Sequence, residues 1–112
     1  MNFAIVGCGF IAKKHAKAIS EIKGSKLVAV LDKIPEAMEF YTNEYGANQY
    51  TELEDMLSYE EIDIVCICTP SGFHASIAVQ VAKAKKHIIV EKPIAMSIKD
   101  TDQIIEACKE NN

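Results

Sequence analysis

Short apolar runs alternate along the chain with segments in which apolar residues recur at helical spacing. The first run, residues 3–6, contains no alternating polar residue, which is typical of a parallel strand covered by helices on both faces. Similar runs predict further strands at residues 27–31, 47–50, 62–68 and 87–90. Because no hairpin signal joins these runs, the pattern predicts a parallel sheet with helical crossovers.

The segments between the strands predict helices at residues 11–23, 35–45, 53–57 and 73–86, and a last helix after residue 97. Gly24 is expected to end the first helix in a left-handed conformation, and Pro35 to occupy the first turn of the second. Thr51 and Glu54 have the spacing of a capping box at the start of the third helix. Together these elements predict a doubly wound α/β fold.

Length and composition limit the chain to one domain. Its 112 residues, 49% hydrophobic and 25% charged, are typical of a single globular domain, expected here over residues 1–112. A closed eight-stranded barrel needs about twice this length. No apolar run approaches the ~20 residues that span a bilayer, and the chain does not begin with a basic signal-peptide region. We therefore expect a cytoplasmic protein.

Charge and cysteine content exclude several kinds of partner. The net charge of −4 argues against binding to nucleic acid or to an anionic membrane. Cys66 and Cys68 are separated by one residue rather than by the two of a zinc or redox pair, and they lie in an apolar run. All four cysteines are therefore expected to be thiols, and no metal site is predicted.

A glycine-rich loop follows the first strand directly and precedes the first helix. It consists of Gly7, Cys8, Gly9, Phe10, Ile11 and Ala12, a G-x-G-x-x-A sequence in the context that a dinucleotide-binding fingerprint requires. Gly7 would allow the tight turn, Gly9 would let the backbone approach a pyrophosphate, and Ala12 would keep the helix close to the sheet. Cys8 is expected to be a small apolar filler. The alternative is a strand-to-helix turn with no ligand.

Asp32 ends the second strand, about 20 residues after the loop. At this position a carboxylate can accept hydrogen bonds from both hydroxyls of an adenosine ribose. Its negative charge would repel a 2′-phosphate, which favours NAD over NADP, although the neighbouring Lys33 would soften that preference. The alternative for Asp32 is an exposed loop acid.

Two further segments and one helical residue carry a resemblance to a known family. A Thr-Pro pair, Thr69 and Pro70, is followed by His74, a Glu-Lys-Pro element follows the fifth strand, and His15 lies in the first helix. With the glycine loop and Asp32, these features make the whole chain resemble the Gfo/Idh/MocA group of sugar-oxidising and cyclitol-oxidising oxidoreductases. Many dinucleotide-binding domains have the glycine loop, but few also have the Thr-Pro…His and Glu-Lys-Pro elements.

The resemblance implies a Rossmann-type, doubly wound parallel sheet and a catalytic role for Lys92. This lysine would hold the substrate oxygen in the nicotinamide cleft and help to move its proton; the alternative is a surface lysine before a turn. A lysine at the carboxyl end of a parallel strand also lies at the usual ligand crevice. His74 could instead only begin a helix, and His15 is expected to be structural. The implied cofactor-binding set is Gly7, Gly9, Phe10, Ile11, Ala12, Asp32, Lys33, Thr69, Pro70, His74, Glu91, Lys92 and Pro93.

Family members also have a second domain that binds the sugar-like substrate and mediates oligomerisation. We therefore expect this chain to be the N-terminal cofactor domain of a two-domain, NAD-dependent oxidoreductase, inactive alone and a homo-oligomer only with that second domain. The reaction would transfer a hydride between the cofactor and a secondary alcohol of a sugar, nucleotide-sugar or cyclitol. The form of the first helix makes an amino-uronic nucleotide-sugar one candidate substrate. The alternative is a non-catalytic dinucleotide-binding or redox-sensing module.

Overall fold

The predicted five-stranded parallel α/β fold is confirmed. The structure, a computed structural model, describes residues 1–58, 62–69 and 74–90. The elements follow one another as β1 (Asn2–Val6), α1 (Phe10–Glu21), β2 (Lys26–Leu31), α2 (Pro35–Tyr45), β3 (Asn48–Tyr50), α3 (Leu53–Leu57), β4 (Ile64–Ile67), α4 (His74–Lys83) and β5 (His87–Val90). All strand pairs are parallel, and the order in the sheet is β3-β2-β1-β4-β5.

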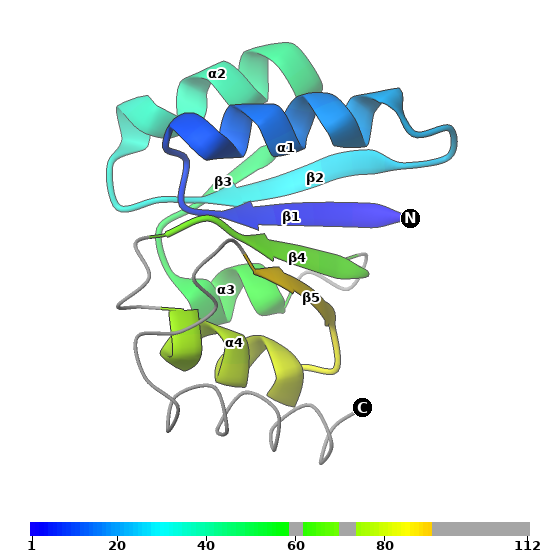
Figure 1. The fold of residues 1–112 in the computed structure, drawn as a ribbon. Coiled ribbons are helices and arrows are strands. Elements are labelled where there is room, and N and C mark those ends of the chain that lie inside the picture. Colours follow the sequence, from blue (N-terminus) through cyan, green and yellow to red (C-terminus); the bar gives the residue numbers. More distant parts are fainter. Residues whose placement is uncertain (59–61, 70–73, 91–112) are drawn as a thin grey trace.

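The sheet lies between two helical layers, with α1 and α2 on one face and α3 and α4 on the other (Figure 1). Alternate side chains of β1 enter the two cores. Phe3 and Ile5 pack under α1 and α2, whereas Ala4 and Val6 pack on the side of α3 and α4. Both faces are therefore apolar, which explains why the strand sequences show no polar alternation.

Strand β2 contains one residue more than its partner β1. Phe3 pairs with Leu27 but Ala4 pairs with Ala29, so that Val28 is passed over in the register. Val28 and Ala29 consequently both pack in the core on the side of α3 and α4. Beyond this local bulge the pairing is again regular up to the carboxyl end of the strands, where Val6 pairs with Leu31.

Two predicted helix ends are wrong. Helix α1 ends at Glu21, and Gly24 instead occupies the third position of a turn closed by the Ser25 amide on the Ile22 carbonyl at 3.0 Å. Its φ of +83° is the conformation for which type II turns use glycine. The capping box is also absent, because α3 begins at Leu53 after Glu52 and no side chain caps it.

Other predicted ends are confirmed or shifted. Pro35 occupies the first turn of α2, and Gly46 ends that helix in the left-handed region, with φ +71°. Helix α4 and strand β4 are both shorter than predicted, and the helix expected after residue 97 lies outside the described residues. No helix in the described part of the chain is long and apolar enough to cross a membrane.

The carboxyl ends of the strands lie at one edge of the sheet. Val6 pairs with both Leu31 and Ile67, and Leu31 pairs with Tyr50. From the adjacent strands β1 and β4 the chain continues to helices on opposite faces of the sheet (Figure 1). Such a switch point opens a crevice between the two connecting loops, the usual ligand site of open α/β sheets.

Candidate dinucleotide-binding site

Gly7, the first residue after β1, must be a glycine for two reasons. Its φ is +90°, a conformation that other residues rarely adopt. A Cβ atom at this position would also lie 2.8 Å from both Cγ2 and the backbone nitrogen of Thr69, in the loop after β4. The Gly7 amide donates a hydrogen bond to the Leu31 carbonyl at 2.8 Å. The turn is therefore fixed by its neighbours on both sides, β2 and the β4 loop.

Gly9 is different, because nothing in the described protein requires a glycine there. It precedes α1 with an extended backbone, φ −82° and ψ −164°, and a Cβ atom would meet no atom of the described residues within 4 Å. Gly9 is exposed. The space beside it is therefore open to a ligand that approaches the backbone closely.

The amino-terminal end of α1 carries amide hydrogens that no side chain of the described residues caps, and no acidic residue lies in its first turn. Such an end attracts anions. Phe10 begins the helix, and the Ile11 side chain is half-buried. Ala12 is completely buried and packs in the core beneath α1, so that the helix lies close to the sheet.

The carboxylate of Asp32 is not that of an isolated loop acid. One oxygen, Oδ2, accepts a hydrogen bond from the Cys8 amide in the glycine loop at 2.8 Å. The other, Oδ1, accepts one from the Ile34 amide at 2.9 Å, and the Asp32 amide donates to the Tyr50 carbonyl at 3.2 Å. The spacing in the sequence correctly predicted that Asp32 lies at the carboxyl end of β2, but it did not predict the hydrogen bond from the Cys8 amide.

The thiol of Cys8, a residue of the glycine loop, is buried. Burial, and secondly the nearby Asp32 carboxylate, raise the pKa of this thiol from 9.0 to about 12. It therefore stays protonated at neutral pH and is a poor nucleophile. The prediction of a small apolar filler is consistent with this environment. Cys66 is also buried, Cys68 is half-buried, and Cys108 lies outside the described residues.

The loop after β4 lies beside the glycine loop. The Cys68 amide donates to the Val6 carbonyl at 2.8 Å, which extends the β1–β4 ladder by one step. Thr69 follows and is half-buried against the Gly7 turn. The structure therefore brings Thr69, Gly7 and, through Cys8, Asp32 into one local arrangement.

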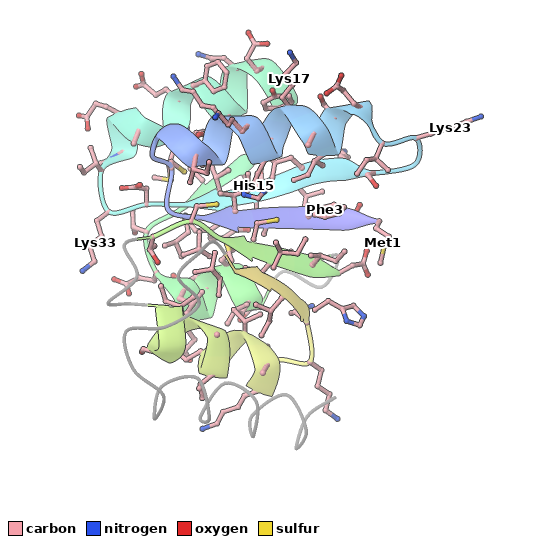
Figure 2. All side chains as sticks on the ribbon, viewed as in Figure 1. Met1, Phe3, His15, Lys17, Lys23 and Lys33 are labelled. Atoms are coloured by element: carbon pink, nitrogen blue, oxygen red, sulfur yellow. The ribbon has the colours of Figure 1, made fainter. Side chains whose placement is uncertain are left out.

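The remaining predicted site residues either lie away from the glycine loop or fall outside the described residues. Lys33 is exposed and projects away from the sheet, whereas His15 is half-buried on the sheet-facing side of α1 (Figure 2). Helix α4 begins at His74, whose side chain is outside the description. Pro70, Glu91, Lys92 and Pro93 also lie outside the described residues, so their predicted roles stay predictions.

The described residues contain no group of three or more His, Cys, Asp or Glu side chains that could hold a metal ion. Among the described residues, this edge offers backbone amides, the Asp32 carboxylate and an open glycine backbone. These are the groups that bind a phosphate pair and a ribose.

Comparison with known proteins agrees with this geometry. A family model described as "Oxidoreductase family, NAD-binding Rossmann fold" matches residues 1–112. The WlbA dehydrogenase of Bordetella pertussis, solved in complex with NADH and UDP-GlcNAcA, is 37% identical with a TM-score of 0.93, over 98% of this chain and 34% of that one. Inositol 2-dehydrogenase of Rhizobium meliloti is 40% identical over 94 residues, 84% of this chain and 28% of that protein.

A third relative uses the other nicotinamide cofactor. The NADP(+)-dependent scyllo-inositol 2-dehydrogenase of Bacillus subtilis is 31% identical over 112 residues, 99% of this chain and 34% of that protein. The chain thus spans about a third of the length of these relatives. Because the family model covers all 112 residues, the chain belongs to the Gfo/Idh/MocA oxidoreductase family and has its NAD-binding Rossmann fold.

Proposed function

We propose that residues 1–112 are the cofactor domain of an oxidoreductase and bind NAD across the carboxyl edge of the sheet. The observation that carries this proposal is the 2.8 Å bond between the Asp32 carboxylate and the Cys8 amide. It joins the group suited to a ribose to the loop suited to a pyrophosphate. The open space at Gly9 and the uncapped end of α1 support the same assignment.

The hydrogen-bonding capacity of Asp32 fits a ribose. An ionised carboxylate offers about four lone-pair sites. Two of them accept the Cys8 and Ile34 amides, one on each oxygen. One site on each oxygen therefore remains, which matches the two hydroxyls of an adenosine ribose.

The same carboxylate favours NAD over NADP. A 2′-phosphate would replace a hydroxyl donor by a second anion next to Asp32, where like charges repel. Lys33 is the cation nearest in sequence, but its side chain projects into solvent (Figure 2). We therefore expect tighter binding of NAD, even though a relative uses NADP.

Calorimetric titration of the chain with NAD, NADH and NADP at fixed ionic strength tests this proposal. Saturable binding of NAD and NADH, weaker for NADP, is the expected result. Asp32→Ala should narrow the difference between NAD and NADP. Equal affinities in the unmodified chain would contradict the ribose role, and a folded chain that binds none of the three would contradict the cofactor role.

For the full-length protein we propose oxidation or reduction of a secondary alcohol of a sugar, nucleotide-sugar or cyclitol. The relatives named above are dehydrogenases of these substrate classes. When bound, NAD supplies the carbon that accepts or returns the hydride. Lys92 would hold the substrate oxygen and take up its proton, with Thr69, Pro70, His74, Glu91 and Pro93 lining the cleft around it.

The catalytic proposal is tested by Lys92→Ala in a full-length protein that carries this domain. Lost turnover with unchanged NAD affinity is the expected result, because the cofactor is held mainly by the loop and Asp32. Lys17→Ala is the matched control, since Lys17 is an exposed lysine of α1 (Figure 2). Full turnover in the Lys92 variant would contradict the catalytic role of Lys92. An unmodified full-length protein that binds NAD but turns over no sugar, nucleotide-sugar or cyclitol would favour the alternative, a non-catalytic or redox-sensing dinucleotide-binding module.

We also propose a cytoplasmic protein whose partner is a small sugar-like molecule rather than nucleic acid. The net charge of −4 argues against a nucleic-acid partner, and the thiols of Cys8, Cys66 and Cys68 support a reducing compartment. Oligomers would form through the additional domain of the longer protein. Size-exclusion chromatography of this chain and of a full-length protein tests the last point, with a monomer expected for the chain alone.

A further inference from the structure

We propose that Asp32 is a positioning residue for the glycine loop, in addition to any contact that it makes with a ribose. This inference rests on the proposed cofactor site and adds a second role for one of its residues. In that role Asp32 acts on the pyrophosphate through the loop, and not only on the ribose directly.

Strand β2 holds the glycine loop through two successive amides. The backbone ladder between β1 and β2 ends where the Gly7 amide donates to the Leu31 carbonyl at 2.8 Å. The next amide, that of Cys8, also points to β2, but it is taken up by the Asp32 side chain at 2.8 Å. The carboxylate thus extends the ladder by one residue, into the loop.

The other carboxylate oxygen of Asp32 is held as well. Asp32 Oδ1 accepts the Ile34 amide at 2.9 Å, and the Asp32 backbone amide is fixed on the Tyr50 carbonyl at 3.2 Å. The carboxylate is therefore held in orientation from the side of α2 and β3. A fixed acceptor can position the Cys8 amide, whereas a freely rotating one could not.

The amides of the glycine loop and those of α1 have different partners. Gly7 and Cys8 direct their amides towards β2, and the helix α1 starts at Phe10 after the extended Gly9. In the first turn of α1 the Ala12 amide donates to the Gly9 carbonyl at 3.2 Å, and no side chain of the described residues caps the helix end, which can therefore bind a ligand. Loss of the Cys8 bond would leave the turn at Gly7 in place but loosen the loop between Cys8 and α1, so that the end of the helix would be held less firmly in one position.

A consequence follows for cofactor specificity. Removing the Asp32 carboxylate relieves repulsion of a 2′-phosphate but also releases the loop that binds the pyrophosphate of both cofactors. Asp32→Ala should therefore narrow the difference in affinity between NAD and NADP mainly by weakening the binding of NAD, without creating tight binding of NADP. A side chain that keeps a neutral acceptor at position 32 should give a better NADP site than alanine does.

The tether is tested first without any ligand, by amide hydrogen exchange of the Cys8 amide. Asp32→Ala should accelerate its exchange by about tenfold or more, since a bond to a carboxylate is lost. Asp63→Ala is the matched control, because Asp63 Oδ2 also accepts a strand amide, that of Asn2 at 2.8 Å, at the opposite edge of the sheet. Exchange of Cys8 as slow in Asp32→Ala as in the control would overturn the proposal.

Inorganic pyrophosphate, which has no ribose, then tests the effect on the loop. Its affinity is measured by titration of Asp32→Ala, Asp32→Asn and Asp63→Ala. The first two variants lose the same charge, so a difference in their pyrophosphate affinity cannot come from charge. Asparagine keeps an acceptor for the Cys8 amide and alanine does not, so we expect affinities that differ by several-fold and follow the protection of that amide. Equal affinity despite different protection would mean that Asp32 acts through the ribose alone and would overturn the positioning role.

The two proposals fail separately in these measurements. If the unmodified chain binds neither NAD nor pyrophosphate, the proposed function fails, while the exchange of Cys8 still reports on the tether. If NAD binds and the exchange is unchanged in Asp32→Ala, only the positioning role fails. Circular dichroism of each variant confirms that it is folded before either result is interpreted.

Discussion

Two glycines of the same loop are glycines for different physical reasons. Gly7 combines a φ of +90° with a contact that leaves no room for a Cβ atom next to Thr69. Gly9 has an extended backbone that any residue can adopt, and open space beside it. The fold therefore requires the first glycine, whereas nothing in the described residues requires the second, and we expect a ligand to do so.

This difference predicts opposite behaviour of two alanine variants. Gly7→Ala should lower the free energy of unfolding by roughly 3 kcal/mol, from backbone strain and steric overlap. Gly9→Ala should lower it by less than about 1 kcal/mol, because its backbone conformation is allowed for alanine. Urea denaturation measures both changes, and titration with NAD should show weakened binding by Gly9→Ala.

Either of two results would contradict this interpretation. Equal losses of stability would show that Gly9 is structural, and unchanged NAD affinity of Gly9→Ala would show that no ligand approaches it. The sequence motif alone could not separate the two roles. Its letters are the same at both positions, and the contact with Thr69 joins residues far apart in the chain.

Tyr41 gives a second prediction at this scale. Its side chain is completely buried, yet its hydroxyl makes no hydrogen bond with any residue that the structure describes. A buried hydroxyl without a partner is destabilising, so Tyr41→Phe should raise the free energy of unfolding by about 1 kcal/mol. The ring would keep its edge contact with Phe40, at 5.2 Å between centroids. Tyr45→Phe, at a half-buried position of the same helix, should change stability less.

Among the elements, existence and type were predictable, but some ends were not. The apolar periodicity is a local property of the sequence, and it predicted all the strands and helices of the described residues. The start of α3 depends instead on the sheet. Tyr50 accepts the Asp32 amide, so Thr51 must leave the strand before a helix can begin at Leu53. Side-chain capping by Thr51 is lost for that reason.

Helix α2 carries the prediction that belongs to this scale. Gly46 ends the helix with φ +71°, and its amide donates to the Thr42 carbonyl at 2.9 Å. A Cβ atom there would meet nothing within 4 Å, so strain comes from the backbone alone. Gly46→Ala should lower the free energy of unfolding by about 1 to 2 kcal/mol. Denaturation with urea measures the change, and a loss below that of Gly9→Ala would contradict it.

In the whole molecule, the sheet order determines what can meet. Because β1 lies between β2 and β4, the glycine loop lies between Asp32 on one side and Thr69 on the other. Spacing in the sequence predicted a ribose-binding carboxylate at the end of β2, but the bond to Cys8 depends on the register of β1, β2 and β3, whose carboxyl ends lie together. The substrate could not be predicted, since this chain spans only about a third of its relatives.

Alkaline pH should destabilise the whole fold through its buried acids. Burial raises the pKa of Cys8 from 9.0 to about 12, and burial followed by Cys8 raises that of Tyr41 from 10.0 to about 12. In the unfolded chain both groups lose their protons near their ordinary pKa values, whereas the folded chain keeps them. The free energy of unfolding should therefore be unaffected by these groups below pH 9.0 and fall as the pH rises towards about 12.

The contribution of one buried acid is obtained from a variant that lacks it. Cys8→Ala removes the thiol and, with it, the contribution of Cys8 to the raised pKa of Tyr41. Urea denaturation without cofactor should show a constant cost of this substitution at neutral pH, because a small cavity is left. As the pH rises above 9.0, that cost should shrink. The thiol of the parent chain ionises in the unfolded state but stays protonated in the folded state, which destabilises the parent chain and not the variant. A cost that stays the same at every pH would mean that the Cys8 thiol ionises as readily in the folded chain as in the unfolded one.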